Sequence, residues 1–223
     1  MSAILLPAGA IAPGTTVDLP EDELRHLRVR RASVGDRVRL LDGAGIVGLG
    51  RLASRNGDWT VEIESARRVG RAAPLILLAG AGDRDRFGLL VEKATELGAT
   101  EVVAVETDRS RSVAGRVRGE HLDRLRRRAL EALKQCGGAW VPEVRGPLAF
   151  EDALGFAGDC TRWLASASDE RLPGEVPGGP LAVLVGPEGG FTARERDAAL
   201  AAGWAPVRLA RATLRFDTAG IVA

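Results

Sequence analysis

The sequence contains few of the residues from which metal centres, disulfide frameworks and imidazole-based catalytic sites are built. Its 223 residues include only two cysteines and two histidines. Cys136 and Cys160 lack the spacing of metal ligands, and two cysteines do not form a disulfide framework in a chain of this size. His26 and His121 leave little from which to build a histidine-rich metal site or a catalytic triad. We therefore expect two reduced, structural thiols and no bound metal.

Long hydrophobic runs are absent as well. The composition, 45% hydrophobic and 27% charged, is ordinary for a globular protein, and no apolar run approaches the roughly 20 residues that span a bilayer. The N-terminal stretch "MSAILLPAGAIAPGTT" has no basic leading segment and only a short apolar run, unlike a secretory signal. The expected location is the cytoplasm, with no membrane partner.

Lysine is scarce, at two residues, so arginine carries nearly all the positive charge, and it is unevenly distributed. Residues 25–39 contain six arginines and one acidic residue, and residues 107–128 contain eight arginines and three acidic residues. A single cluster of this kind is often only a solvated surface. Two such clusters in a chain with a formal net charge of +1 favour a polyanionic partner such as a nucleic acid.

The first 70 residues have the pattern of a small β-rich domain with one short helix. The helix is expected within residues 19–31. Three strand-like runs follow within residues 36–69, separated by the turn-forming sequences Asp42-Gly43 and Asn56-Gly57-Asp58. This pattern predicts a barrel-like or meander domain over residues 1–70. The segment "RRVGRAAP" has the composition of a linker to the next domain.

From residue 71 onwards, strand-like and helix-like segments alternate. The alternation predicts an α/β domain over residues 71–223, with a parallel sheet covered by helices on both faces. The expected strands are "LILLAG", "EVVAVE", "RWLAS", "LAVLVG" and "APVRLA". The expected helices are "RFGLLVEKATELG", "EHLDRLRRRALEALKQ", a short helix near "FEDALGF", and "ARERDAALAAG".

A glycine-rich loop, "GPEGGF", follows the apolar run "LAVLV". Thr192 and Glu195 have the spacing of a capping box, so the next helix is expected to begin at Thr192, and its N-terminus exposes backbone N–H groups to a ligand. The loop is not a phosphate-binding P-loop, because Phe191 stands where a lysine is needed, and it is not a G-x-G-x-x-G dinucleotide motif. Two interpretations remain. The loop either presents its backbone to a ligand, with Gly189 and Gly190 allowing close approach, or is an ordinary strand-to-helix turn.

Five segments of the chain match one known family in the same order. They are residues 26–45, residues 91–110, residues 131–144, the loop "GPEGGF" with its helix, and "LRFDTA" after the strand "APVRLA". Together they resemble the RsmE family of SPOUT-class RNA methyltransferases. The resemblance implies a PUA-like β-barrel RNA-binding domain followed by a SPOUT α/β domain, whose doubly wound parallel sheet ends in a C-terminal trefoil knot, a rare exception to the rule against threaded chains.

The resemblance also implies an activity, a cofactor and partners. The family methylates N3 of a uridine in small-subunit (16S) ribosomal RNA and uses S-adenosylmethionine, which is bound in the knot. It acts as a homodimer whose paired knots build each site. The expected substrate is the ribosomal RNA or, as the family suggests, the assembled subunit.

The site residues follow from the same resemblance. The implied cofactor-binding residues are Ala165, Ser166, Leu184, Gly186, Pro187, Glu188, Gly189, Gly190, Leu209, Leu214 and Arg215. The expected RNA-binding residues rest instead on the two arginine clusters. They are expected to hold phosphates without reading sequence, and they are Arg25, Arg28, Arg30, Arg31, Arg109, Arg111, Arg116 and Arg118.

Arg215 and Asp217 are the candidate catalytic residues. Uracil N3 carries a proton at neutral pH, and methyl transfer to N3 requires that this proton leave. Arg215 is expected to stabilise the developing uracil anion, and Asp217 to orient Arg215 or to accept the proton. The alternative is a structural ion pair at a helix start. Glu188 is expected to shape its loop rather than to act as the base.

The chain departs from the family pattern at three places. Ala212 and Gly138 stand where the family has arginines, and the sequence stops at Ala223, about one turn into the helix expected after Asp217. Weaker contacts to RNA or cofactor would follow, although Arg211 could substitute for one arginine. An alternative function is therefore an RNA-binding ribosome-assembly factor with weak or lost methyltransferase activity. A third interpretation is a nucleotide-dependent enzyme with an unusual glycine loop.

Overall fold

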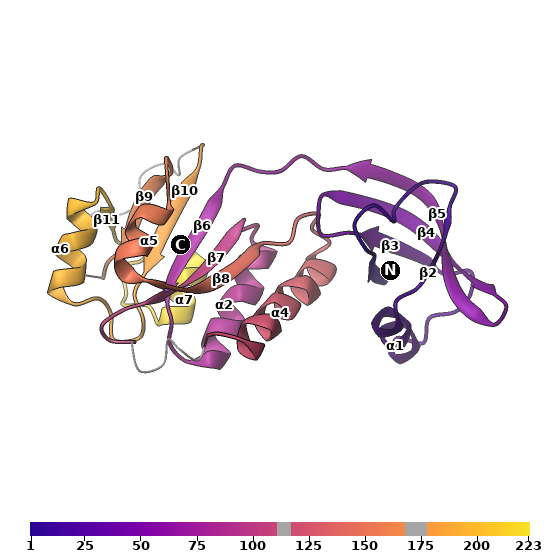
Figure 1. Ribbon diagram of the computed structural model, residues 1–223, viewed down its shortest axis with the longest axis horizontal. Coiled ribbons are helices and arrows are strands. Elements are labelled where there is room, and N and C mark those ends of the chain that lie inside the picture. Colours follow the sequence, from indigo (N-terminus) through magenta and orange to yellow (C-terminus); the bar gives the residue numbers. More distant parts are fainter. Residues whose placement is uncertain (111–116, 168–177) are drawn as a thin grey trace. The chain divides into compact units, whose positions relative to one another are not determined.

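The computed structural model describes residues 1–110, 117–167 and 178–223, and the chain forms two compact units. The first unit comprises Met1–Arg71 and Leu130–Val141, and the second comprises Ala72–Ala129 and Pro142–Ala223. Figure 1 labels most of the helices and strands of both units. Each unit has its own sheet and its own hydrophobic core.

The first unit is built on a five-stranded sheet with the strand order β1-β3-β4-β5-β2. Its elements are β1 (Ala3–Leu5), β2 (Thr16–Asp18), α1 (Glu21–Val29), β3 (Arg37–Leu41), β4 (Ile46–Arg55) and β5 (Asp58–Arg68). β1 pairs with β3 in parallel, and the other pairs are antiparallel. The β4–β5 hairpin turns at Asn56 and Gly57, whose φ angles of 56° and 90° are left-handed, as a two-residue hairpin turn requires. The predicted helix, the three predicted strands and this turn are confirmed, whereas β1 and β2 are additional.

The segment Leu130–Val141 packs with the first unit, although the sequence assigned it to the second domain. It includes the end of α4 (Glu120–Cys136), where Leu133 is buried in a cluster with Leu41 and Val47. The sequence did not indicate this packing. The reason is tertiary packing, because an apolar stripe on a helix does not show which core it will enter.

The described part of the second unit contains a six-stranded sheet with the order β11-β9-β10-β6-β7-β8, in which every neighbouring pair is parallel. Its strands are β6 (Leu75–Gly80), β7 (Glu101–Glu106), β8 (Glu143–Ala149), β9 (Thr161–Ala165), β10 (Leu181–Val185) and β11 (Ala205–Val207). Its helices are α2 (Arg84–Glu96), the first part of α4, α5 (Phe150–Phe156), α6 (Ala193–Ala201) and α7 (Phe216–Val222). The predicted α/β class with a parallel sheet is confirmed.

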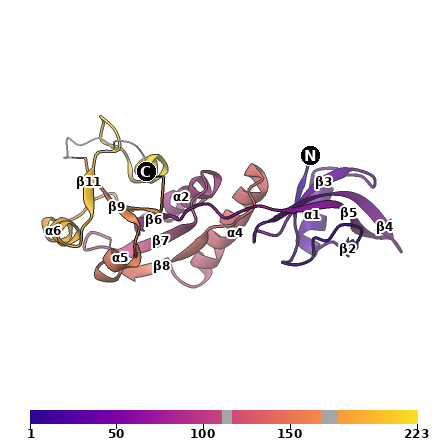
Figure 2. The same cartoon turned by 90° about the horizontal axis from the view of Figure 1, so that it is seen from above.

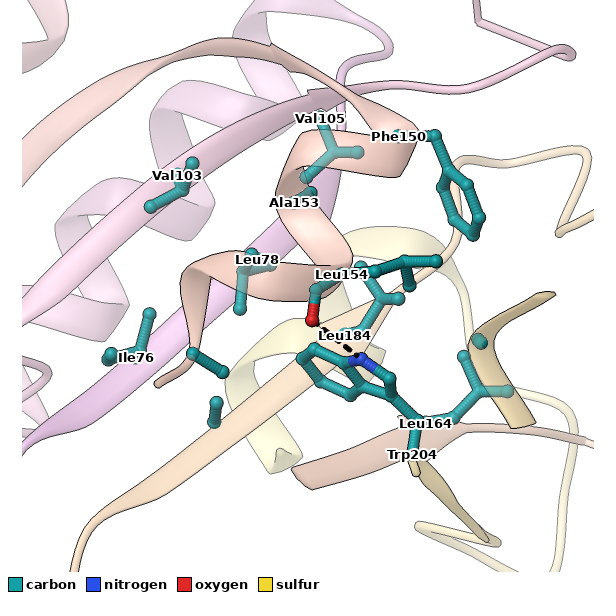
Figure 3. Close-up of a cluster of buried hydrophobic side chains, with 13 residues drawn as sticks. Ile76, Leu78, Val103, Val105, Phe150, Ala153, Leu154, Leu164, Leu184 and Trp204 are labelled. Carbon is teal, nitrogen blue, oxygen red and sulfur yellow. Dashed lines mark hydrogen bonds between the residues drawn. The ribbon is translucent and has the colours of Figure 1, made fainter. Parts of the chain in front are cut away.

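One face of this sheet packs against α5 and α6. Alternate strand residues such as Leu78 and Leu184 enter a buried cluster with Leu154 of α5 and with Trp204, which follows α6 (Figure 3). The indole Nε1 of Trp204 donates a hydrogen bond to the carbonyl oxygen of Leu154 at 3.3 Å. The intervening residues, such as Leu77, lie toward the opposite face because successive side chains of a strand alternate.

The C-terminal helix α7 lies beside α2 in both views (Figures 1 and 2). The rings of Phe216 and Phe87 stack with their centroids 6.3 Å apart. At Gly220 an added Cβ would collide with Leu90 of α2, so the two helices approach closely there. The helix expected after Asp217 therefore forms, and packing on α2 supplies the stability that so short a helix lacks alone.

The helix starts follow their capping residues. Thr192 is the N-cap of α6, and the predicted capping box with Glu195 is confirmed. The Asp83 side chain caps α2 by accepting hydrogen bonds from the backbone N–H groups of Asp85 and Arg86. Across the described residues, no helix combines the length and the apolar character needed to cross a membrane.

Candidate functional site

A cavity of about 580 Å³ lies at the edge of the second unit's sheet where β9 and β10 end. Its size is in the range of small-molecule sites. Three chain segments, which follow β9, β10 and β11, form most of its wall, because the ends of neighbouring parallel strands meet at one edge. The lining residues are Arg86, Leu164, Ala165, Ser166, Ala167, Val185, Gly186, Pro187, Glu188, Gly190, Phe191, Arg196, Leu209, Ala210, Ala212, Thr213, Leu214, Arg215, Phe216 and Ala219.

The structure brings most of the predicted cofactor-binding residues together in this wall. Those that line the cavity are Ala165, Ser166, Gly186, Pro187, Glu188, Gly190, Leu209, Leu214 and Arg215. Two do not. Leu184 is fully buried in the core cluster that faces α5 and α6, since its side chain alternates with that of Val185. Gly189 lies off the wall, and a Cβ added there would meet the Arg109 side chain, 3.2 Å from its Cδ, rather than a ligand.

Several lining residues were not among the predicted ones. Arg86 lies in the first turn of α2, and Arg196 lies in the first turns of α6. Phe191 lines the cavity while its ring also packs against Phe150 of α5, with the centroids 5.8 Å apart. Arg86 could not be found from the sequence, because its place depends on β6 being the neighbour of β10. Arg196 could have been suspected from its position one turn after the capping residue Thr192.

The glycine turn, residues 186–190, packs closely on the segment that follows β6. A Cβ added at Gly80 would lie 2.5 Å from Cδ of Pro187, and one added at Gly82 would collide with the carboxylate of Glu188. Gly80 therefore requires glycine because the backbone of Pro187 approaches it, whereas at Gly82 the neighbouring atoms are those of the Glu188 side chain. Within the turn, the Gly190 N–H donates to the Pro187 carbonyl at 2.8 Å, and Gly190 has a left-handed φ of 69°.

The carboxylate of Glu188 lies at the N-terminus of α2. Its Oε1 accepts the backbone N–H of Asp83 at 3.4 Å and lies 3.8 Å from Nη1 of Arg86. A negative charge at this position interacts favourably with the helix dipole. These contacts support the view that Glu188 shapes the glycine turn. Glu188 is also the one acidic residue among the described residues that line the cavity.

The end of β9 is held by the helix that follows the glycine turn. Nη1 of Arg196 donates to Oγ of Ser166 at 2.8 Å, and the Ser166 N–H donates to the carbonyl of Val207 at 2.9 Å. Both Arg196 and Ser166 line the cavity. The arrangement ties together the segments after β9 and β10 and the strand β11.

Arg215 and Asp217 form an ion pair at the start of α7. Nη2 of Arg215 lies 3.4 Å from Oδ2 of Asp217, and the side chains are 71% and 6% exposed, respectively. Arg215 lines the cavity and Asp217 does not. Oδ1 of Asp217 is buried and has no hydrogen-bond partner within the part of the chain that the structure describes. Such a group is costly to bury unless a partner is supplied.

The predicted RNA-binding arginines that the structure describes lie outside the cavity. Four of them, Arg25, Arg28, Arg30 and Arg31, are exposed residues in or just after α1 of the first unit. Arg25 lies within 4.0 Å of acidic residues on its own helix. In the second unit, Arg118 is exposed, and the guanidinium of Arg109 donates to the carbonyl oxygen of Gly189. Arg111 and Arg116 lie outside the described residues.

Neither histidine lines the cavity. His121 lies in the first turn of α4, where burial first, and then the nearby Arg84 and Arg124, lower its pKa. Neither imidazole is therefore part of the cavity wall.

Comparisons with known proteins match both units. Residues 71–223 match the family described as RNA methyltransferase domain, and residues 19–64 match the RNA methyltransferase PUA domain. The chain is 31% identical to ribosomal RNA small subunit methyltransferase E of Synechocystis over 93% of this chain and 71% of that protein. The crystal structure of ribosomal RNA small subunit methyltransferase E from Neisseria gonorrhoeae, bound to S-adenosyl methionine, has a TM-score of 0.88 and 29% identity, covering 99% of this chain and 94% of that one.

A further structure, a probable rRNA-methyltransferase from Porphyromonas gingivalis, has a TM-score of 0.81 and 28% identity, covering 100% of this chain and 94% of that one. The class that the fold and the site define is an RNA methyltransferase with a PUA domain and an α/β domain. Within that class, the chain belongs to the ribosomal RNA small subunit methyltransferase E family. The family resemblance found in the sequence is thus confirmed.

Proposed function

We propose that this chain methylates N3 of a uridine in small-subunit (16S) ribosomal RNA, with S-adenosylmethionine as the methyl donor. The observation that carries the proposal is the cavity of about 580 Å³ walled by the segments after β9, β10 and β11. Membership of the family supports action on small-subunit ribosomal RNA, and the Neisseria gonorrhoeae relative was solved with S-adenosyl methionine bound. The choice of uridine N3 rests on the sequence resemblance to the family.

The residues of the cavity fit S-adenosylmethionine. Val185, Leu209 and Leu214 offer apolar surface suited to an adenine ring, and the backbone of the glycine turn offers polar groups for its edges. Glu188 supplies a negative charge for a ligand that carries a positive sulfonium. When bound, S-adenosylmethionine supplies an electrophilic methyl group on a positively charged sulfur.

We propose that the Arg215–Asp217 pair manages the charge on the uracil. The guanidinium of Arg215 is at the cavity wall and largely exposed, so it can stabilise negative charge on a uracil that loses its N3 proton. Asp217 holds Arg215 through Oδ2, while Oδ1 has no partner among the described residues. Asp217 therefore orients Arg215 and is the candidate acceptor for the proton.

The protein lowers the barrier to methyl transfer mainly by aligning the methyl donor with the uracil. Holding two reactants in line is worth on the order of 7 to 11 kcal/mol of the barrier. The contacts of Glu188 with the start of α2, and of Arg196 with Ser166, fix two of the three wall segments. Glu188 and Arg196 therefore affect alignment indirectly, by holding the backbone of the cavity wall in place.

RNA is proposed to bind through exposed arginines that hold phosphates. Arg28, Arg30 and Arg31 are exposed at the end of α1, and Arg118 is exposed in the second unit. Guanidinium contacts to phosphate position a nucleic acid without reading its sequence. The uridine is then selected at the cavity rather than by these arginines.

The finer features implied by the family belong to the same proposal. We propose that the chain is a homodimer acting in the cytoplasm on the ribosomal RNA or on the assembled subunit. We also propose that the C-terminal part is threaded as a trefoil knot. The parallel order β11-β9-β10 and the common wall formed by the segments after these strands support the knot.

The test combines cofactor binding with methylation. Calorimetry is expected to show binding of S-adenosylmethionine, and mass spectrometry of ribosomal RNA from cells with and without the gene is expected to show one N3-methyluridine that depends on the gene. Cofactor binding without any change in the RNA would favour the ribosome-assembly factor instead. Binding of ATP or NAD in place of S-adenosylmethionine would contradict the proposal.

A further inference from the structure

The turn that follows β7, residues 107–110, is closed by its own hydrogen bonds. The Ser110 N–H donates to the Thr107 carbonyl at 3.0 Å, and the Thr107 N–H donates to Oγ of Ser110 at 3.1 Å. The two hydroxyl oxygens lie 2.9 Å apart, and both residues are about 1% exposed. A turn with buried and mutually bonded ends is a rigid base for the two residues between them.

One of those two residues joins the turn to α6. The backbone N–H of Asp108 donates to Oε1 of Glu195 at 2.7 Å. Oε2 of Glu195 accepts from the N–H and the hydroxyl of Thr192 at 2.8 and 2.9 Å, and Glu195 is 3% exposed. One buried carboxylate thus caps α6 and holds the turn after β7 at the same time.

The other residue, Arg109, reaches the glycine turn. Its Nη1 donates to the carbonyl oxygen of Gly189, and its aliphatic part lies against Gly189, where an added Cβ would be 3.2 Å from Cδ and 3.4 Å from Cβ of Arg109. Glu188 and Gly190, on either side of Gly189, line the cavity, whereas Gly189 does not. Arg109 therefore contacts the glycine turn at a residue that is not part of the cavity wall.

We propose that Arg109 is a positioning residue, which fixes the Gly189–Gly190 peptide so that the turn is preorganised for the ligand of the cavity. The inference rests on the proposed function in that the ligand is S-adenosylmethionine. Adjacent glycines have wide backbone freedom, and Gly190 must keep its left-handed φ of 69°. The guanidinium of Arg109 donates a charged hydrogen bond to the Gly189 carbonyl, and this bond restricts the freedom of the two glycines because Arg109 itself lies in the rigid turn 107–110. The role differs from the phosphate contact that the sequence suggested for Arg109.

The first measurement is calorimetry of S-adenosylmethionine binding to the whole protein without RNA. Arg109→Ala is expected to weaken binding about tenfold, the loss of one partly exposed charged hydrogen bond, and Arg109→Lys to restore part of it. In turnover, the KM for S-adenosylmethionine is expected to rise with little change in kcat. The control is Arg194→Ala, since Arg194 is 74% exposed and pairs only with Glu151 among the contacts described for it. Equal affinity of Arg109→Ala and the unmodified protein would overturn the proposal.

The second measurement separates positioning from phosphate binding. The salt dependence of RNA binding by Arg109→Ala is expected to keep the slope of the unmodified protein. A slope smaller by about 0.7 to 0.9, together with unchanged cofactor affinity, would make Arg109 a phosphate contact and overturn the proposal.

A third measurement needs no cofactor. The Gly190 N–H is bonded to the Pro187 carbonyl, so its hydrogen exchange reports on the order of the turn. Arg109→Ala is expected to accelerate this exchange at least tenfold, in contrast to Arg194→Ala. If the unmodified protein binds no S-adenosylmethionine, the proposed function fails, and this exchange rate still decides the role of Arg109, since an unchanged rate overturns it.

Discussion

At the scale of single residues, glycines around the cavity are needed for different reasons. A Cβ at Gly82 would collide with the carboxylate of Glu188, which comes from another loop, so this carboxylate keeps its place only beside a glycine. Gly189 has room for a Cβ only if the Arg109 side chain gives way by a few tenths of an ångström. Neither glycine makes room for a ligand directly. Both make room for the side chains that fix the glycine turn.

Gly82→Ala tests the contact between the two loops. The new methyl group is expected to push the Glu188 carboxylate off the start of α2, because it would otherwise collide with it. Affinity for S-adenosylmethionine should fall about tenfold, or ~1.4 kcal/mol, by calorimetry. The control is Gly155→Ala in α5, where no atom lies within 4 Å of the added Cβ, and which should leave affinity unchanged and stabilise the fold by about 0.4 to 1 kcal/mol. Equal affinities in both variants would contradict the role given to Glu188.

Asp217→Asn tests whether the pair at the start of α7 is catalytic. The amide keeps the shape of the side chain but neither accepts a proton nor holds the Arg215 guanidinium by charge. We expect kcat to fall by about 100-fold, at the lower end for loss of a general base, with the affinity for S-adenosylmethionine within about twofold. Asp152→Asn, an exposed acid in the first turn of α5, is the matched control for loss of a helix-start charge. A kcat like that of the unmodified protein would reduce the pair to a structural one.

At the scale of elements, a buried ion pair joins α1 to the end of α4 within the first unit. Nζ of Lys134 lies 2.8 Å from Oε1 of Glu23, and both side chains are 7% exposed. Oε2 of Glu23 has no hydrogen-bond partner among the described residues. A pair of this kind depends on both partners, because an unpaired buried charge is far more costly than the pair is favourable.

Lys134→Met is therefore expected to destabilise the first unit by about 3 to 5 kcal/mol, measured by urea-induced unfolding. The double variant Glu23→Leu, Lys134→Met should recover most of that loss, since no unpaired buried charge then remains; Glu131, whose carboxylate lies 3.4 Å from Nζ of Lys134, is 64% exposed. Lys93→Met is the control, because Lys93 pairs with Glu92 and Glu96 at the surface, where ion pairs contribute little to stability. If Lys134→Met is as stable as the unmodified protein, the pair of Glu23 and Lys134 contributes nothing to the free energy of unfolding.

Local patterns predicted the elements better than their partners. The capping box at Thr192 and the turn at Asn56-Gly57 were predictable because each depends on residues three or fewer positions apart. The strands β1 and β2 were missed because three residues are too few to show an alternation. The packing of Leu130–Val141 with the first unit was also missed, since the pattern of a helix shows its apolar side but not what covers it.

At the scale of the whole molecule, the cavity is assembled from segments that are distant in sequence. The family resemblance indicated the three loops after β9, β10 and β11, and the structure brings most of their predicted residues to one wall. The resemblance could not indicate Arg86, because that residue lies at the cavity only as a result of the pairing of β6 with β10. Nor could it show that Leu184 points away from the cavity, since that depends on which face of the sheet each helix covers.

The arginines proposed to hold RNA lie on both units, and the salt dependence of RNA binding tests the part assigned to those of the first unit. Arg28 and Arg31 are exposed at the end of α1. Replacing both by alanine should weaken binding to small-subunit RNA and reduce the slope of log K against log salt by about 0.7 to 0.9 for each lost phosphate contact. Arg55→Ala is the control, because Arg55 is 59% exposed on the same unit but paired with Asp18 at 2.9 Å. An unchanged slope in the double variant would mean that the arginines of α1 are solvated surface and that RNA is held by the second unit alone.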